Sequence, residues 1–150
     1  WLERRYGLTG MDPETQVILP LIEDDLLDSL VAVAERKMPD RPLRIKNQWS
    51  LCVVLASAGY PDDYRVGEQI EFKDKLDPRT LLFHAGTKTE DSKIVTASGR
   101  VMNVVTILES LKIAKQRAYE EIKKIHFKGM FFRKDIGNTG MKKMKRKRRK

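Results

Sequence analysis

The segment from Trp49 to Thr106 constrains the fold most, because short runs of β-branched and apolar residues alternate there with glycine-containing turns. Trp49–Ala58 is predicted to be a buried strand that ends at a Gly-Tyr-Pro turn. Further short strands are predicted at Gln69–Phe72, Leu81–His84, Ile94–Thr96, Arg100–Thr106 and Met130–Arg133. This part of the chain is therefore expected to form an antiparallel sheet region.

A helical signal precedes the strands. Asp12 is a preferred N-cap residue, Pro13 suits the first helical position, and Glu14 favours the positive end of the helix dipole. Apolar residues then recur on one helical face over residues 18–33. Pro20 is expected to divide this segment into two short helices, because proline breaks the helical hydrogen-bond pattern.

A second helical signal follows the strands. Its apolar residues are spaced three or four apart, at Ile107, Leu111, Ala114, Ala118, Ile122 and Ile125. This spacing predicts one long amphipathic helix, with His126 at its C-terminal end. Strands in the middle with helices on either side predict an α+β fold rather than a wound parallel sheet.

Composition limits the classes of protein that this chain can represent. Its 150 residues are 41% hydrophobic and 34% charged, which is typical of a globular domain. No window approaches the roughly 18 apolar residues of a membrane helix, and no signal peptide opens the chain. Cys52 is the single cysteine, so an intrachain disulfide is excluded and a packed core thiol is expected. We therefore expect a cytoplasmic protein without a metal site.

The positive charge is concentrated at the C-terminus. The net charge is +9, and removing the eight cations of the last nine residues leaves +1 for residues 1–141. Such a block predicts a disordered, solvated tail over residues 138–150. The alternative is nonspecific binding of nucleic acid or an anionic membrane by the tail. The cations are Lys142, Lys143, Lys145, Arg146, Lys147, Arg148, Arg149 and Lys150.

Two glycine turns are candidates for binding an anion. Ser98-Gly99-Arg100 lies between two predicted strands, and Gly86-Thr87-Lys88 follows another, which ends at His84. Backbone amides beside a guanidinium suit a phosphate, although hairpin geometry explains the glycines equally well. Neither turn matches a P-loop or a dinucleotide-binding fingerprint.

Five short motifs together resemble the phosphoribosylamine–glycine ligase (glycinamide ribonucleotide synthetase) family. In chain order they are Asp12-Pro13-Glu14-Thr15-Gln16 with the following 17–21, then Ala56–Pro61, Phe83–Thr87, Gly99-Arg100-Val101 and Arg133–Gly137. The resemblance covers residues 12–137. It implies an ATP-grasp ligase of purine biosynthesis, which joins phosphoribosylamine to glycine using ATP and Mg²⁺ or Mn²⁺.

The resemblance also implies a division of the chain. Residues 12–37 would be the helical connection from the ATP-grasp core, and residues 38–137 the small β-rich C-terminal domain. His84, Gly86, Thr87, Gly99 and Arg100 would face the phosphoribosyl group. The missing ATP-grasp domains would be the partner, and glycine and phosphoribosylamine the substrates.

The departures from the family pattern lie at the N-terminus. Two metal ligands, in a Glu-x-Asn motif, would fall on Arg5 and Gly7, which cannot supply ligand oxygens from their side chains. Residues 1–11 therefore read as a divergent leader. Because the chain starts at Trp1, we expect lost upstream residues, a disrupted gene or a start at Met11. We expect this chain alone to be inactive. The alternatives are a remnant whose tail binds nucleic acid, and a non-catalytic interaction module that uses the surface that would dock on the ATP-grasp core.

Overall fold

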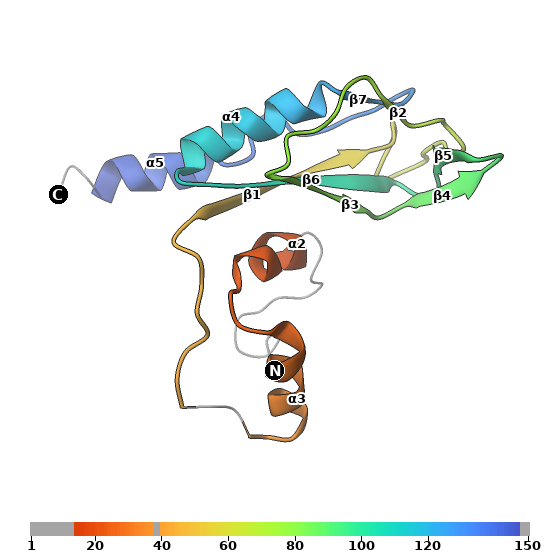
Figure 1. The fold of residues 1–150 in the computed structure, drawn as a ribbon. Coiled ribbons are helices and arrows are strands. Elements are labelled where there is room, and N and C mark those ends of the chain that lie inside the picture. Colours follow the sequence, from red (N-terminus) through yellow and green to blue (C-terminus); the bar gives the residue numbers. More distant parts are fainter. Residues whose placement is uncertain (1–13, 38–39, 148–150) are drawn as a thin grey trace.

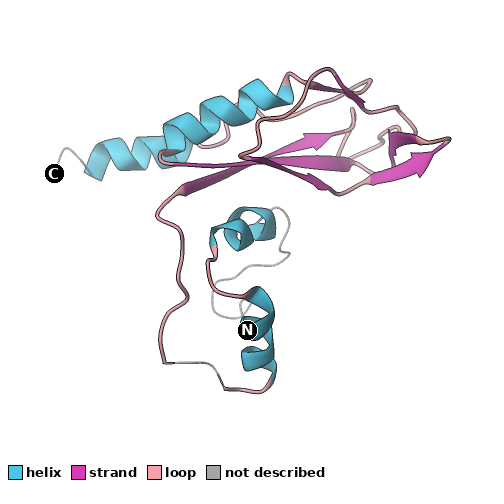
Figure 2. Cartoon of the chain, viewed as in Figure 1, coloured by secondary structure: helices cyan, strands magenta, loops and turns pink. Residues whose placement is uncertain are grey.

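The computed structural model describes residues 14–37 and 40–147, and Figure 1 shows their arrangement. The chain begins with helix α2 (Glu14–Ile18), the 3₁₀ turn η1 (Leu19–Leu21) and helix α3 (Leu26–Ala34). It then enters a region of small antiparallel sheets with a helix packed on it, coloured by secondary structure in Figure 2. The predicted mixed α+β architecture is confirmed.

The main sheet has three strands in the order β1-β6-β3, formed by β1 (Trp49–Ala56), β6 (Arg100–Leu108) and β3 (Thr80–His84). Both pairs are antiparallel, and Val104 of β6 lies opposite Val53 on one side and Leu82 on the other. The register shifts between Leu55 and Ala56, where β1 reaches the turns that follow it. β6 is the central strand, which agrees with its almost complete burial.

Two further strand pairs extend the sheet region. β4 (Thr87–Glu90) pairs with β5 (Lys93–Thr96) through a turn in which Asp91 and Ser92 both have positive φ angles. β2 (Glu71–Phe72) pairs with β7 (Ile125–His126), so the segment after the helix returns to the segment before β3. The β4 strand was not predicted, because Thr-Lys-Thr-Glu lacks the apolar alternation typical of a half-buried strand.

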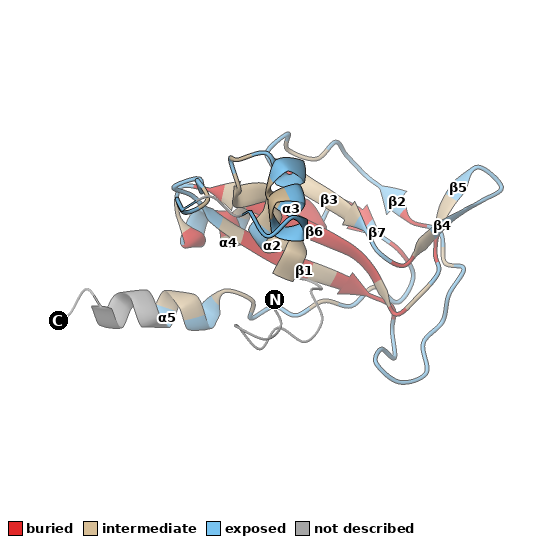
Figure 3. Cartoon of the chain, turned by 90° about the horizontal axis from the view of Figure 1, so that it is seen from below, coloured by how far each residue is buried: buried red, intermediate tan, exposed pale blue. Residues whose placement is uncertain are grey.

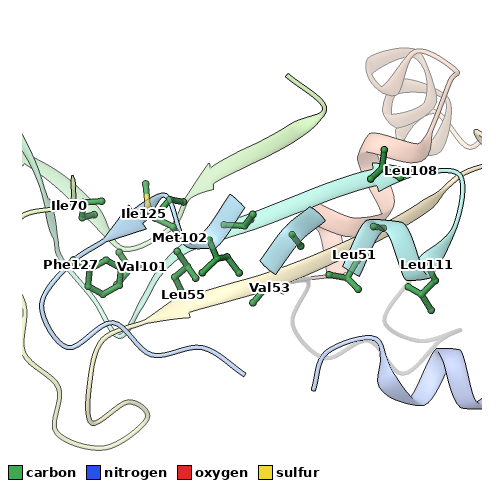
Figure 4. Packing of buried hydrophobic residues seen from close by; sticks show 14 residues of the cluster. Leu51, Val53, Leu55, Ile70, Val101, Met102, Leu108, Leu111, Ile125 and Phe127 are labelled. Carbon is green, nitrogen blue, oxygen red and sulfur yellow. The ribbon is translucent and has the colours of Figure 1, made fainter. Parts of the chain in front are cut away.

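Helix α4 (Leu111–Ile122) covers one face of the main sheet (Figure 1). Ser110 caps it, because its hydroxyl accepts a hydrogen bond from the backbone N–H of Ile113. The core lies between this helix and the sheet, with Val53 and Leu55 fully buried (Figure 4). The buried residues of α4 are Leu111, Ala114, Ala118, Glu121 and Ile122.

The N-terminal helices lie on the other side of the sheet from α4 (Figure 1). Pro20 occupies the 3₁₀ turn that separates α2 from α3, so the prediction of two short helices divided by proline is confirmed. The connection after α3 is held by Asp24, whose carboxylate accepts hydrogen bonds from the guanidinium groups of Arg41 and Arg44. Asp12 and Pro13 of the predicted helix start lie outside the described residues.

Three predicted boundaries were wrong. Ile107 belongs to β6 rather than to the helix, because strand pairing continues to Leu108 and α4 begins only after the Ser110 cap. His126 therefore lies in β7 and not at a helix end. Residues 130–133 form no strand beyond a single bridge between Phe131 and Ala56, which follows a turn at residues 128–129.

Residues 138–147 form helix α5 (Asn138–Lys147), which differs from the expected disordered tail. Gly137 has a φ of 82°, which suits glycine, and the Lys115 ammonium contacts the side-chain oxygen of Asn138. Met141 packs against the core, so the start of the helix is anchored. Lys, Arg and Met are good helix formers, and the positive charge of the lysines and arginines does not prevent a helix. Arg148, Arg149 and Lys150 lie outside the described residues.

Burial is distributed unevenly, as Figure 3 shows. The buried residues gather in β1, β6 and α4, whereas α2, η1 and α3 contain none. Among the described residues, no helix combines the length and the apolar character needed to cross a membrane.

Candidate functional site

An open pocket of about 550 Å³ lies where β3 and β6 meet the turns that precede or follow them. It is lined by residues from the α2 helix, from the segment after β1 and from the two glycine turns. The lining residues are Gln16, Tyr60, Tyr64, His84, Ala85, Gly86, Ser98, Gly99 and Arg100. Four of the five residues predicted to face a phosphoribosyl group therefore come together, although the two turns were identified separately in the sequence.

The two glycine turns are packed directly on each other. The backbone N–H of Gly86 donates to the carbonyl oxygen of Arg100 at 2.8 Å, and the N–H of Ala97 donates to the carbonyl oxygen of Gly86 at 2.7 Å. A Cβ on Gly86 would lie 1.8 Å from Oγ of Ser98. Residue 86 must therefore be glycine for this approach, and its amide is used within the protein rather than offered to a ligand.

The second turn is packed against an aromatic ring. A Cβ on Gly99 would lie 2.2 Å from Cδ2 of Tyr60, so the ring occupies the space that any other side chain would need. Ser57 joins the same turn, because its backbone N–H donates to the Gly99 carbonyl at 2.8 Å and its hydroxyl donates to the Ser98 carbonyl at 3.2 Å. The glycine at position 99 thus serves packing between two turns.

The remaining predicted residues lie at the rim. Nδ1 of His84 and Oγ1 of Thr87 are 2.9 Å apart, so Thr87 orients the imidazole although it does not itself line the pocket. His84 is exposed and Arg100 is half-buried. Arg100 carries the fixed positive charge among the lining residues named above, which favours an anionic ligand.

Among the lining residues outside the predicted site, three have large side chains. Tyr60 was assigned to a turn without a role, Gln16 was quoted as part of the signature motif, and Tyr64 had no signal at all in the sequence. The Tyr60 and Tyr64 rings lie 6.2 Å apart between centroids at 57°. A sequence pattern could not place them here, because their position depends on the path of the chain after β1.

Two other hollows lie elsewhere on the molecule. One of about 500 Å³ lies between η1 and the ends of β3 and β6, and one of about 420 Å³ surrounds Asp24 at the start of α3. Both arginines of the second hollow are already paired, since Asp24 accepts from Arg41 and Arg44. Neither hollow contains a residue that the sequence singled out for ligand binding.

The perturbed carboxylates lie outside the pocket. Hydrogen bonds from Arg79 lower the pKa of Asp77 from 3.8 to about 2, with a smaller contribution from Arg117. Hydrogen bonds from Arg41, followed by those from Arg44, lower the pKa of Asp24 well below its usual range. These shifts are explained by ion pairs that hold loops, so they indicate no catalytic acid or base.

The other described residues that the sequence singled out lie outside the pocket. Glu14 and Thr15 form the first turn of α2 and are half-buried. Cys52 is buried in β1, and its Sγ lies 3.9 Å from Oδ1 of Asn103. Lys142 is exposed on α5. Within residues 14–37 and 40–147, no three His, Cys, Asp or Glu side chains gather as a metal site requires.

Comparison with known proteins identifies the family. The model of the phosphoribosylglycinamide synthetase C domain matches residues 50–139. The phosphoribosylamine–glycine ligase of Caldanaerobacter subterraneus is 42% identical over 132 residues, which are 88% of this chain and 30% of that protein. A bifunctional purine biosynthetic protein of Pichia angusta is 39% identical over 91% of this chain and 18% of its own length.

A solved structure agrees with these relatives. The crystal structure of the phosphoribosylamine–glycine ligase of Thermotoga maritima matches with a TM-score of 0.70 and 34% identity, over 83% of this chain and 30% of that chain. This chain thus spans less than a third of the length of the relatives named here. The family match covers more than half of the chain and includes both glycine turns, and the chain therefore belongs to the phosphoribosylglycinamide synthetase C-domain family.

Proposed function

We propose that this chain is the C-terminal portion of a phosphoribosylamine–glycine ligase. Such an enzyme joins glycine to 5-phosphoribosylamine with ATP in de novo purine biosynthesis, a cytoplasmic pathway. Support comes from the family model that matches residues 50–139 and from ligase relatives that are about 40% identical over most of the chain. Within it, residues 38–137 are proposed as the β-rich C-terminal domain and residues 12–37 as the connection to the ATP-grasp domains.

The pocket at the glycine turns is proposed as the wall of the phosphoribosyl site. The observation that carries this assignment is the convergence of His84, Gly86, Gly99 and Arg100 on one pocket. The guanidinium of Arg100 suits the phosphate, because a charged donor forms stronger hydrogen bonds to an anion than a neutral donor does. The imidazole of His84 supplies a further polar contact, whereas the Ser98 hydroxyl already donates to the Arg100 carbonyl. This replaces the predicted cradle of backbone amides, since the Gly86 amide is already bonded.

ATP and the divalent metal are assigned to the rest of the enzyme. The family implies both, yet the described residues do not gather the side chains of a metal site. Arg5 and Gly7 stand where the resemblance places two metal ligands. For that reason we expect no ADP release when residues 1–150 alone receive glycine, ATP, magnesium and phosphoribosylamine. Turnover above a no-protein control, in material free of host ligase, would contradict this expectation.

A chimera tests the proposed function. The C-terminal 30% of the Caldanaerobacter ligase would be replaced by the matching part of this chain and expressed in a purine auxotroph that lacks the ligase. Growth without purines is the expected result. Absence of growth with a folded, soluble chimera would reject the assignment.

Within the chimera, Arg100→Ala tests the pocket. We expect kcat/KM for phosphoribosylamine to fall about ten- to hundredfold, which corresponds to one charge-assisted contact, while the KM for ATP stays unchanged. Lys88→Ala is the matched control, because Lys88 is an exposed cation on β4 that pairs with Glu90 and does not line the pocket. Unchanged kinetics in Arg100→Ala would return Arg100 to a structural role.

The alternative of a nucleic-acid-binding remnant has gained no support. The relatives named above are described as purine biosynthetic enzymes. Nucleic-acid binding by the tail is therefore not proposed as a second function.

A further inference from the structure

Tyr60 and Tyr64 are large aromatic residues that the core does not explain. Their side chains are 37% and 41% exposed, and neither belongs to the core cluster. Both line the pocket, and their rings contact each other in a tilted arrangement. No hydrogen bond of either phenol hydroxyl is formed within the described part of the chain. The pair thus lines the pocket with two aromatic side chains that each carry a hydroxyl group.

Tyr60 is fixed to the turn that carries Arg100. Its backbone N–H donates to the Ser57 carbonyl at 3.2 Å, and its ring lies against Gly99. Ser57 is buried and bonded to both Ser98 and Gly99. The ring of Tyr60 and the backbone of Arg100 are therefore parts of one packed unit, so their relative position is set before a ligand arrives.

We propose that Tyr60 and Tyr64 bind the sugar ring of a sugar phosphate whose phosphate lies at Arg100, and thereby select sugar phosphates over free phosphate. Aromatic rings cover the C–H face of a sugar, while a phenol hydroxyl hydrogen-bonds to sugar hydroxyls. The inference rests on the proposed function for the phosphate side of the pocket. It adds two specificity-determining residues. Tyr64 contacts the sugar, and Tyr60 both contacts the sugar and supports the turn that carries Arg100.

Binding of two probes to the full 150-residue chain tests the proposal. Ribose 5-phosphate and inorganic phosphate would be titrated by calorimetry, with chemical-shift changes of the glycine turns as a second readout. We expect ribose 5-phosphate to bind about tenfold more tightly, because only this ligand can use the aromatic wall. Tyr64→Ala is expected to remove that advantage and leave the affinity for phosphate unchanged.

Two further variants sharpen the result. Tyr64→Phe keeps the ring and is expected to lose about fivefold in ribose 5-phosphate affinity, as one hydrogen bond is removed. Phe72→Ala is the matched control, since Phe72 is 43% exposed and does not line the pocket. Circular dichroism and thermal unfolding establish that each variant folds.

Several outcomes would overturn the proposal. It fails if ribose 5-phosphate shows no saturable binding, if both probes bind equally, or if Tyr64→Ala weakens both probes by the same factor. The proposed function is judged separately, because the growth of the chimera and the Arg100→Ala kinetics do not depend on Tyr64. If Arg100→Ala weakens both probes while Tyr64→Ala changes neither, the phosphate assignment stands and the sugar assignment is wrong.

Discussion

The N-terminal helices and the sheet with α4 contain similar apolar side chains but bury them very differently. In α3, Leu27 is 68% exposed and Leu30 is 57% exposed, whereas Val53 and Leu55 of β1 are completely buried. In the sequence, the α3 segment is amphipathic, whereas the β1 segment is a nearly continuous apolar run. The difference shows that periodicity predicts which face of an element is apolar, while burial depends on whether another layer packs against that face.

The two regions are also held by different forces. Residues 14–46 rely on polar ties, since Asp24 binds Arg41 and Arg44, and the Lys46 ammonium donates to the Pro20 carbonyl. The sheet and α4 rely on a continuous apolar core. Hydrophobic burial is the dominant favourable contribution to folding. We infer that cooperative unfolding reports on the sheet and α4, with α3 contributing little.

Leucine truncation in the two regions should give the largest contrast. Leu55→Ala is expected to lower the free energy of unfolding by about 2–5 kcal/mol, because a cavity remains in a packed core. Leu27→Ala should change it by less than about 0.5 kcal/mol, since the side chain is exposed and alanine favours a helix. Urea unfolding of both variants measures the difference. Equal losses would show that α3 is part of the cooperative core.

Local signals explain why much of the sheet region could be predicted. β-branched runs bounded by glycine turns located β1, β3, β5 and β6, and Pro20 correctly divided the first helical segment. The glycine turns were recognisable because their flanking strands were. Their meeting in one pocket was proposed from family resemblance alone, since strand order is not encoded in the local pattern.

Long-range contacts explain what was missed. Tyr64 reaches the pocket through an irregular segment that carries no periodicity. Glu121 lies on a helix where a charged residue is usually solvated, yet only 1% of it is exposed. Its carboxylate accepts a hydrogen bond from the backbone N–H of Asp77, which is 44 residues away. The start of α4 was misplaced because strand pairing took Ile107 into β6.

Glu121 should be the most important polar residue of the core region. Its carboxylate also binds the Lys124 ammonium at 3.0 Å. Glu121→Gln should lower the free energy of unfolding by about 1.5–3 kcal/mol, as charge-assisted hydrogen bonds are lost. Glu120→Gln is the matched control on the same helix, because Glu120 is 45% exposed and its change should cost less than about 0.5 kcal/mol. Similar losses in both variants would refute the special role of Glu121.

Asp24 and Asp77, two of the aspartates with a lowered pKa, should separate the regions in acid. A carboxylate with a depressed pKa stabilises the folded state above its unfolded pKa, and this contribution is lost as the pH falls toward the folded value. For Asp77 the window runs from about 3.8 down to about 2. Asp77→Asn should therefore flatten the loss of global stability in this window, as measured by urea unfolding at several pH values.

Asp24→Asn should behave differently, although the pKa of Asp24 is also lowered. Its partners tie the start of α3 to the following loop and do not touch the core. We expect faster amide hydrogen exchange in α3 at neutral pH and little change in the global unfolding curve. A global loss in Asp24→Asn as large as that in Asp77→Asn would show that the N-terminal helices unfold together with the sheet.

Removal of residues 142–150 should have the smallest effect on stability and the clearest effect on charge. Met141 packs against the core and its N–H donates to the Gly137 carbonyl, whereas Lys142 is exposed. A chain ending at Met141 keeps that anchor, so its free energy of unfolding should change by less than about 0.5 kcal/mol. Its net charge falls from +9 to +1.

Any affinity for single-stranded RNA should be lost with the tail, and the affinity of the intact chain should fall steeply with salt, because phosphate contacts release counterions. Filter binding at several salt concentrations measures both. If the shortened chain binds RNA as well as the intact chain at moderate salt, the affinity resides in the folded body and not in the tail.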